Sequence, residues 1–66
     1  MQITVNGEPR DVADRLTVAE LLLQLDLRPR QVAVEVSRVI VPRSRHDCHA
    51  LLPNDSIEIV TLVGGG

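Results

Sequence analysis

The sequence has no aromatic residue and no lysine, and it contains a single cysteine. Without aromatic side chains, Val, Leu and Ile must build the core, and a domain this small buries only about 60% of its unfolded surface. All seven basic residues are arginines, set against nine acidic residues. No basic stripe is present that could follow a phosphate backbone, which argues against nucleic-acid binding. A chain of 66 residues also has little material to enclose a substrate pocket, which argues against an independent enzyme.

Other absences bear on the cellular compartment. Cys48 cannot form an internal disulfide, which is typical of a reducing compartment. No apolar run is long enough to span a membrane. The first residues alternate like a strand and lack the basic and apolar regions of a secretion signal. We therefore expect one domain over residues 1–66 that is cytoplasmic, is monomeric on its own and does not associate with membranes.

Alternating apolar and polar residues predict several strands. They are expected over residues 1–5, 8–12, 32–36, 39–41 and 56–62. Asn6-Gly7 favours a two-residue hairpin turn because both residues tolerate positive φ. Pro9 cannot donate to a ladder, so its strand is expected at an edge of the sheet. The polar segment 43–50 is expected to be irregular, with at most a short helical turn.

One helix is indicated by a capping box, with Thr17 as N-cap and Glu20 reaching back to it. Leu16 and Leu21 would form the accompanying hydrophobic staple. A single apolar face follows at helical spacing, made of Val18, Leu21, Leu22 and Leu25. Because Pro29 disfavours helical geometry at the residue before it, we expect a helix of about ten residues that spans roughly 18–25 and ends near Asp26 or Leu27.

The order of these elements predicts an α+β roll. One apolar helix face and one apolar sheet face are best buried against each other. A right-handed crossover through the helix would let the last strand pair parallel to the first. We expect a mixed sheet of four or five strands packed on one helix.

Three of the four glycines are the last three residues, Gly64-Gly65-Gly66. Such an end can simply be a frayed terminus. Residues 63–66 would also make a thin, flexible tail that reaches roughly 13 Å and can thread a narrow channel. The group at its tip is the carboxylate of Gly66. Transfer of AMP from ATP would activate that carboxylate, and a sulfur nucleophile could then displace AMP to leave a thiocarboxylate.

Over its whole length the sequence resembles the ThiS family of sulfur carriers in thiamine biosynthesis, which belongs to the ubiquitin-like β-grasp group together with the MoaD proteins. The segments that carry the resemblance are Asn6-Gly7-Glu8, Thr17-Val18, Val32-Ala33-Val34-Glu35, Val41-Pro42-Arg43-Ser44, Asp55-Ser56-Ile57-Glu58-Ile59-Val60 and Leu62-Val63-Gly64-Gly65-Gly66. Two turns depart from the family pattern, since Ser37-Arg38 and Asn54-Asp55 stand where relatives often have a glycine. This leaves the conformation of those turns open.

The resemblance implies that an E1-like, ThiF-like adenylyltransferase uses ATP and Mg to adenylate Gly66. Sulfur would come from cysteine through a desulfurase, and the thiocarboxylate would donate it to a ThiG-like thiazole synthase. The chain would bind no cofactor of its own and would act as a co-substrate. Gly64 and Gly65 would thread the channel, and Leu62 and Val63 would contact the partner. Leu62 and Val63 could equally cap the core.

Two alternatives of function remain open from the sequence: a small subunit of molybdopterin synthase, or a β-grasp interaction domain without terminal chemistry. His46-Asp47-Cys48-His49 contains metal-ligand residue types, but its spacing differs from that of structural zinc sites, so we expect no metal. Cys48 lacks a defined activating neighbour, so we expect no catalytic role for it. Arg43 and Arg45 are either solvated loop charges or contacts to an acidic partner.

Overall fold

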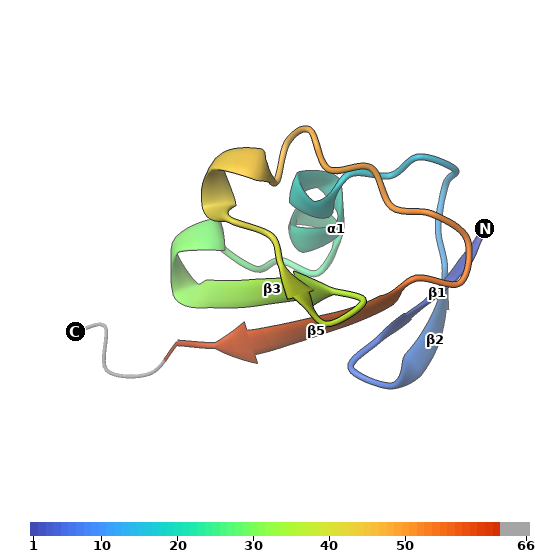
Figure 1. Ribbon diagram of the computed structural model, residues 1–66, viewed down its shortest axis with the longest axis horizontal. Coiled ribbons are helices and arrows are strands. Elements are labelled where there is room, and N and C mark those ends of the chain that lie inside the picture. The colour runs from blue at the N-terminus through green and yellow to red at the C-terminus, as the bar shows by residue number, and fades with distance from the viewer. Residues whose placement is uncertain (63–66) are drawn as a thin grey trace.

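The computed structural model describes residues 1–62 and contains one sheet and one α-helix, α1 (Val18–Gln24). The strands are β1 (Gln2–Val5), β2 (Glu8–Asp11), β3 (Val32–Val36), β4 (Val39–Ile40) and β5 (Ser56–Thr61). Their order in the sheet is β2-β1-β5-β3-β4, and α1 lies across one face (Figure 1). β5 is parallel to β1 and antiparallel to β3. The predicted α+β fold with a five-stranded mixed sheet is confirmed, although three strands end one residue earlier than expected.

The core lies between α1 and the inner face of the sheet. Val18, Leu21 and Leu22 of the helix are buried, as the helical spacing predicted, and Leu25 is half-buried. The sheet and the connections contribute further buried apolar residues: Ile3, Val12, Leu16, Val32, Val34, Val36, Val41, Leu51 and Ile57. All of these are aliphatic, since the chain has no aromatic residue. No helix within residues 1–62 has the length and apolar character needed to cross a membrane.

The predicted capping box at the start of α1 is present. The Thr17 hydroxyl accepts the Glu20 N–H (3.2 Å), and Glu20 Oε1 accepts the Thr17 N–H (2.8 Å). The bond from the Thr17 backbone N–H, followed by that from its hydroxyl, lowers the pKa of the Glu20 carboxyl below its usual value. The charged form of Glu20 is therefore the form that stabilises the helix start.

The helix has seven residues rather than the ten we expected. Asp26 follows it at a positive φ of 58°. The Asp26 N–H donates to Leu23 O (3.1 Å) and the Leu27 N–H to Leu22 O (2.9 Å), which is the Schellman pattern. The predicted span of roughly 18–25 is therefore one residue too long, and the helix ends before Asp26 because that residue takes a left-handed conformation.

Pro29 instead begins a 3-10 turn, η1 (Pro29–Gln31), that the sequence did not reveal to us. Proline suits this first helical position because its fixed φ is already helical and its missing N–H would be unpaired there. The turn leads directly into β3.

Several tight turns use positive φ, and two of them do so without glycine. Asn6 (φ 51°) and Gly7 (φ 83°) form the predicted β1–β2 turn. Ser37 (φ 52°) and Arg38 (φ 68°) join β3 to β4, and Asn54 also has a positive φ (69°). The turns left open by the family pattern therefore keep left-handed conformations without glycine, at some cost in strain.

The polar segment 43–50 was expected to be irregular with at most a short helical turn, and it contains the short turn η2 (Arg43–Arg45). What the sequence did not indicate is the burial of one of its residues. His46 follows and is 4% exposed, with Nε2 donating to Val41 O (3.0 Å). Nε2 carries the proton because a carbonyl oxygen only accepts, and Nδ1 has no partner among the described residues. His46 is therefore part of the buried framework rather than a solvated loop residue.

Backbone carbonyls of the same segment complete the cap of α1. The Val18 N–H donates to His49 O (3.0 Å) and the Ala19 N–H to His46 O (2.9 Å). Together with the capping box, these bonds satisfy the backbone donors of the first helical turn. The loop between β4 and β5 is therefore fixed onto the helix.

Candidate functional site

The candidate site is the end of β5, from which the glycine-containing tail continues. β5 is the middle strand, and five of its residues, 57–61, pair with the five residues of β3. Its pairing with β1 covers only Ser56 and Ile57. β5 therefore continues past the end of β1 and runs towards one end of the molecule (Figure 1).

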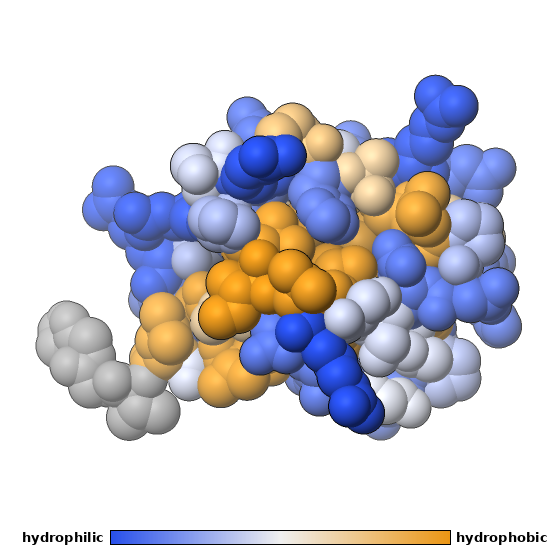
Figure 2. All heavy atoms as spheres, in the orientation of Figure 1, coloured by the Kyte–Doolittle hydropathy of each residue, from blue (hydrophilic) through white to orange (hydrophobic). Residues whose placement is uncertain are grey.

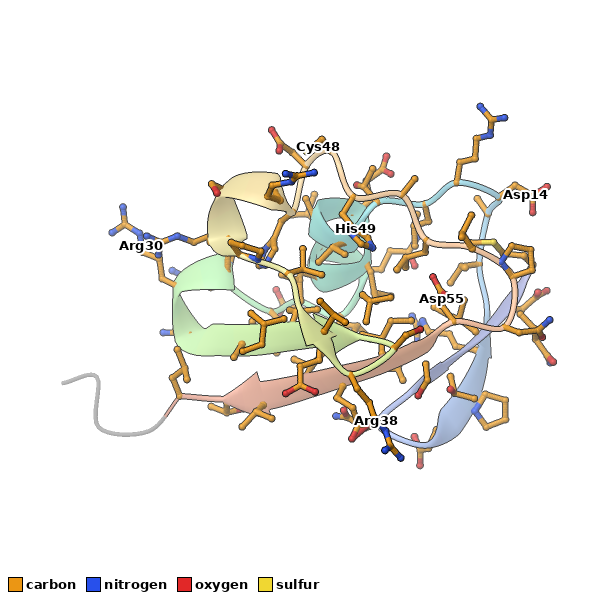
Figure 3. The ribbon with its side chains drawn as sticks, viewed as in Figure 1. Asp14, Arg30, Arg38, Cys48, His49 and Asp55 are labelled. Carbon is orange, nitrogen blue, oxygen red and sulfur yellow. The ribbon has the colours of Figure 1, made fainter. Side chains whose placement is uncertain are left out.

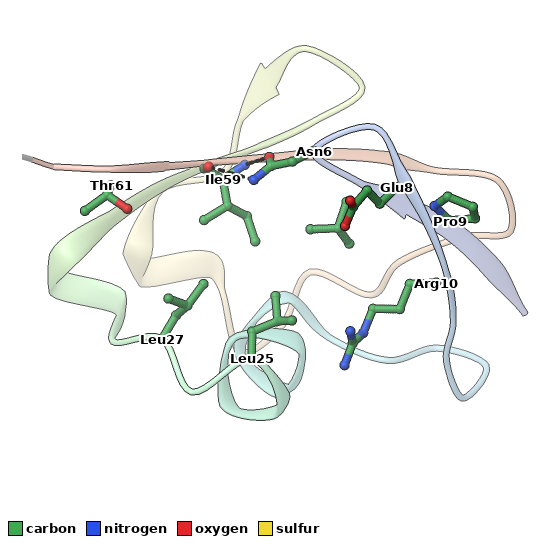
Figure 4. A pocket seen from close by; sticks show the side chains of 9 residues that line it. Asn6, Glu8, Pro9, Arg10, Leu25, Leu27, Ile59 and Thr61 are labelled. Atoms are coloured by element: carbon green, nitrogen blue, oxygen red, sulfur yellow. Dashed lines mark hydrogen bonds between the residues drawn. The ribbon is translucent and has the colours of Figure 1, made fainter.

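The side chain of Asn6 continues the pairing where β1 stops. Asn6 Oδ1 accepts the Ile59 N–H (2.7 Å), and Asn6 Nδ2 donates to Ile59 O (3.2 Å). Figure 4 shows both bonds, with the amide of Asn6 lying beside the backbone of β5. The amide thus replaces the peptide group that an additional residue of β1 would supply. We had assigned Asn6 only to the turn, and this second role was missed.

After β5, the Leu62 N–H donates to Gln31 O of η1 (2.8 Å). This bond fixes the last described residue to the turn that precedes β3. The Leu62 side chain is 52% exposed, so it does not cap the core. Of the two interpretations left open for Leu62, the structure supports an accessible side chain.

An apolar surface extends from β4 to the end of β5. We define it by four large apolar side chains that are at least half exposed: Val39, Ile40, Val60 and Leu62. Figure 2 shows apolar side chains gathering over β4 and towards the end of β5. Val60 lies on β5 and Leu62 directly follows the strand, two positions on, so both project from the same face at its end. Val39 and Ile40 lie opposite Val36 and Glu35 and are therefore nearer to the start of β5. Exposed apolar patches of this kind mark protein interaction sites.

A cleft of about 370 Å³ lies on the other side of the sheet, between the β1–β2 hairpin, β5 and the end of α1. Its apolar lining includes Val5, Leu25, Leu27 and Ile59. Figure 4 shows Leu25 and Leu27 on the side of the helix, facing Ile59 of β5. The polar side chains of the lining are those of Asn6, Glu8, Arg10 and Thr61.

The structure does not gather the residues of the His46-Asp47-Cys48-His49 segment into a site. His46 is buried, whereas Cys48 is exposed and its Sγ lies 3.5 Å from Arg45 O. Within residues 1–62, no three His, Cys, Asp or Glu side chains lie together in a way that could hold a metal ion.

The remaining predicted site residues, Val63, Gly64, Gly65 and Gly66, lie outside the described residues. Their predicted roles stay predictions. Four residues follow Leu62 in the sequence.

Comparison with known proteins agrees with this arrangement. The model of the ThiS family matches residues 3–66. The sulfur carrier protein ThiS of Escherichia coli is 36% identical over 66 residues, covering the whole of both chains. A crystal structure of a thiamine biosynthesis protein (ThiS) from Geobacter metallireducens matches with a TM-score of 0.86 and 35% identity, again over both whole chains.

A longer relative is also similar. A thiazole synthase of Paramagnetospirillum magneticum is 41% identical over 66 residues, and the chain spans only 20% of the length of that protein. The structural match confirms the expected β-grasp fold. The match along residues 3–66, the full-length likeness to a sulfur carrier and the shared fold lead to one conclusion: the chain belongs to the ThiS family.

Proposed function

We propose that this chain is the sulfur carrier of thiamine biosynthesis and that its chemistry takes place at the carboxylate of Gly66. The observation that carries the proposal is the fixed end of β5. Asn6 and Gln31 hold this end through three hydrogen bonds, and the exposed apolar side chains of Val60 and Leu62 lie beside it. A rigid base with a short glycine-rich continuation suits delivery of a terminal group into a partner's active site.

The reaction has two steps, both catalysed by partners. In the first, a carboxylate oxygen of Gly66 attacks the α-phosphorus of ATP, bound with Mg in an E1-like adenylyltransferase, and pyrophosphate leaves. In the second, a sulfur nucleophile attacks the activated carbonyl carbon and AMP leaves. The product is a thiocarboxylate on Gly66, and no ε-amine competes for the activated carbon because the chain has no lysine. The chain itself is a co-substrate.

We further propose a thiazole synthase as the sulfur acceptor and a cysteine desulfurase as the indirect source of sulfur. The similarity of the chain to part of a thiazole synthase supports this choice. The family match favours thiamine biosynthesis over molybdopterin biosynthesis. A cytoplasmic location fits these partners and the single exposed, unpaired Cys48.

The test is sulfur transfer to a defined acceptor. The carrier is first thiocarboxylated with the adenylyltransferase, MgATP and inorganic sulfide, then mixed with thiazole synthase and its small-molecule substrates, or with the large subunit of molybdopterin synthase and its pterin substrate. We expect intact mass spectrometry to show that the thiocarboxylate of the carrier is converted back to the carboxylate only when thiazole synthase is the acceptor. Turnover with the molybdopterin enzyme alone would contradict the proposal.

A further inference from the structure

Three arginines gather at the end of the molecule where β5 stops. Arg28, Arg30 and Arg43 line a shallow hollow of about 520 Å³ together with Pro29 and Gln31. We call these three residues the arginine cluster. All three are exposed. In Figure 3, Arg30 extends outwards at the same end of the molecule to which β5 runs.

The cluster is fixed next to the point where the tail begins. Arg28 and Arg30 flank Pro29, which starts η1, and Gln31 of that turn accepts the hydrogen bond from the Leu62 N–H (2.8 Å). Arg43 starts η2 directly after Pro42. Since proline fixes φ in both places, the arginine backbones are presented in defined positions and only their side chains are free.

The positive charge of the cluster is not neutralised by the part of the chain that the structure describes. Within residues 1–62, the ion pairs are those of the Met1 amino group with Asp11 and Asp14, and none involves the cluster. The chain carries a net charge of −2, yet it concentrates three of its seven arginines here. One end of the protein is therefore basic, although the net charge of the whole chain is negative.

We propose that the arginine cluster binds an acidic surface beside the channel of the adenylyltransferase that activates the tail. This inference rests on the proposed function. The four residues after Leu62 span at most about 14 Å, so a tail in the channel brings the cluster to the rim of the channel. Val60 and Leu62, the part of the apolar surface at the end of β5, supply apolar contact area to the same interface, and charges at its rim steer association and set orientation.

A second feature fixes the orientation. Further back along β5, Glu58 lies directly opposite Glu35 of β3. The surface is therefore basic at the end where the tail begins and acidic nearer to the middle of the sheet. An acidic partner surface is attracted at the tail end and repelled further back, which favours the orientation that inserts the tail.

The experiment compares the variant Arg30→Glu/Arg43→Glu with the matched control Arg15→Glu/Arg38→Glu. Both change the net charge equally at exposed positions, and the control residues do not line the hollow. Initial rates of carrier-dependent adenylation are measured with purified adenylyltransferase at saturating MgATP, from low salt to about 0.5 M NaCl, where the Debye length falls to roughly 4 Å.

At low salt we expect the cluster variant to raise the KM for the carrier at least tenfold while kcat changes less than twofold. Its KM should approach that of the wild type as salt increases, because screening removes the electrostatic contribution. The control should stay within twofold of the wild type. The neutral variant Arg30→Gln/Arg43→Gln should lie between the wild type and the charge reversal, and circular dichroism checks that each variant is folded.

A KM for the folded cluster variant within twofold of the wild type, or an equal rise in the control, would overturn the inference while leaving the proposed function intact. A wild-type carrier that is not adenylated at all would overturn the proposed function itself, and this inference with it.

Discussion

Replacing the side-chain amide of Asn6 by a carboxylate tests how β5 is held in the sheet. In Asn6→Asp, the side chain keeps an oxygen that can accept the Ile59 N–H, but it loses the Nδ2 donor to Ile59 O. A carboxylate oxygen then faces a carbonyl oxygen about where the 3.2 Å bond lay. Loss of a hydrogen bond with repulsion in its place should lower the free energy of unfolding by about 1–2 kcal/mol.

The assay is urea and thermal unfolding followed by far-UV circular dichroism, since the chain has no aromatic residue for fluorescence. For a domain of this size, a loss of 1–2 kcal/mol corresponds to a Tm lower by roughly 4–16 °C. Below about pH 4 the substituted carboxyl is protonated and can donate again, so the deficit relative to the wild type should shrink there.

Asn54→Asp is the matched control. Asn54 also has a positive φ (69°), but within residues 1–62 its side chain makes no hydrogen bond to β5. Its substitution should change the free energy of unfolding by less than about 0.5 kcal/mol. If Asn6→Asp were no more destabilising than Asn54→Asp at neutral pH, the side chain of Asn6 would not be supporting the strand.

Three further outcomes are expected. Glu20 should stabilise the protein relative to Glu20→Gln fully at neutral pH, and this difference should be lost as the pH falls below the usual pKa of 4.5 and through the lowered pKa of the folded state. Urea titrations between about pH 7 and pH 3 measure the difference. A difference that does not depend on pH would contradict the capping role of the Glu20 carboxylate. Asp26→Gly should raise the free energy of unfolding by about 0.5–1 kcal/mol, because glycine adopts φ 58° without strain and a negative charge leaves the helix C-terminus; destabilisation would contradict this. Cys48→Ser should leave thiocarboxylate formation unchanged by intact mass, because the thiol is exposed and its hydrogen bond to Arg45 O involves no activating base. Loss of thiocarboxylate formation in the folded variant would make Cys48 a relay site.

Local patterns predicted those parts of the fold that depend on neighbouring residues. Thr17 and Glu20 lie three positions apart and cap each other, so their roles were visible in the sequence. The alternating valines over Val32–Val36 gave β3 with its full bounds. Pro9 marked an edge strand, because its missing N–H is tolerated only there.

Features that depend on distant residues were not predictable in this way. The bonds of Asn6 to Ile59 join positions 53 residues apart. His46 is buried because its ring reaches Val41 O across a turn, and nothing in the local polar sequence indicates this. The early end of α1 depends on Asp26 taking a left-handed conformation, which aspartate tolerates but does not require.

The candidate site was predicted from the glycine-rich end, and its surroundings were not. Leu62 could be named as a partner contact, but its exposure depends on how β5 leaves the sheet. Val39 and Ile40 joined the apolar surface only through the β3–β4 hairpin. The arginine cluster likewise combines two turns that are separated by β3 and β4.

The central claim is that the carboxylate of Gly66 carries the sulfur. Its most direct test is intact mass spectrometry after incubation with the adenylyltransferase, MgATP and sulfide, for the wild type and for a chain lacking Gly65 and Gly66. The truncation places the carboxylate roughly 7 Å short of its position in the full chain. Because a displacement of about 1 Å can cost a hundredfold in rate, we expect ATP-dependent replacement of one oxygen by sulfur in the wild type alone. Thiocarboxylation of the truncated chain at the wild-type rate would contradict the account.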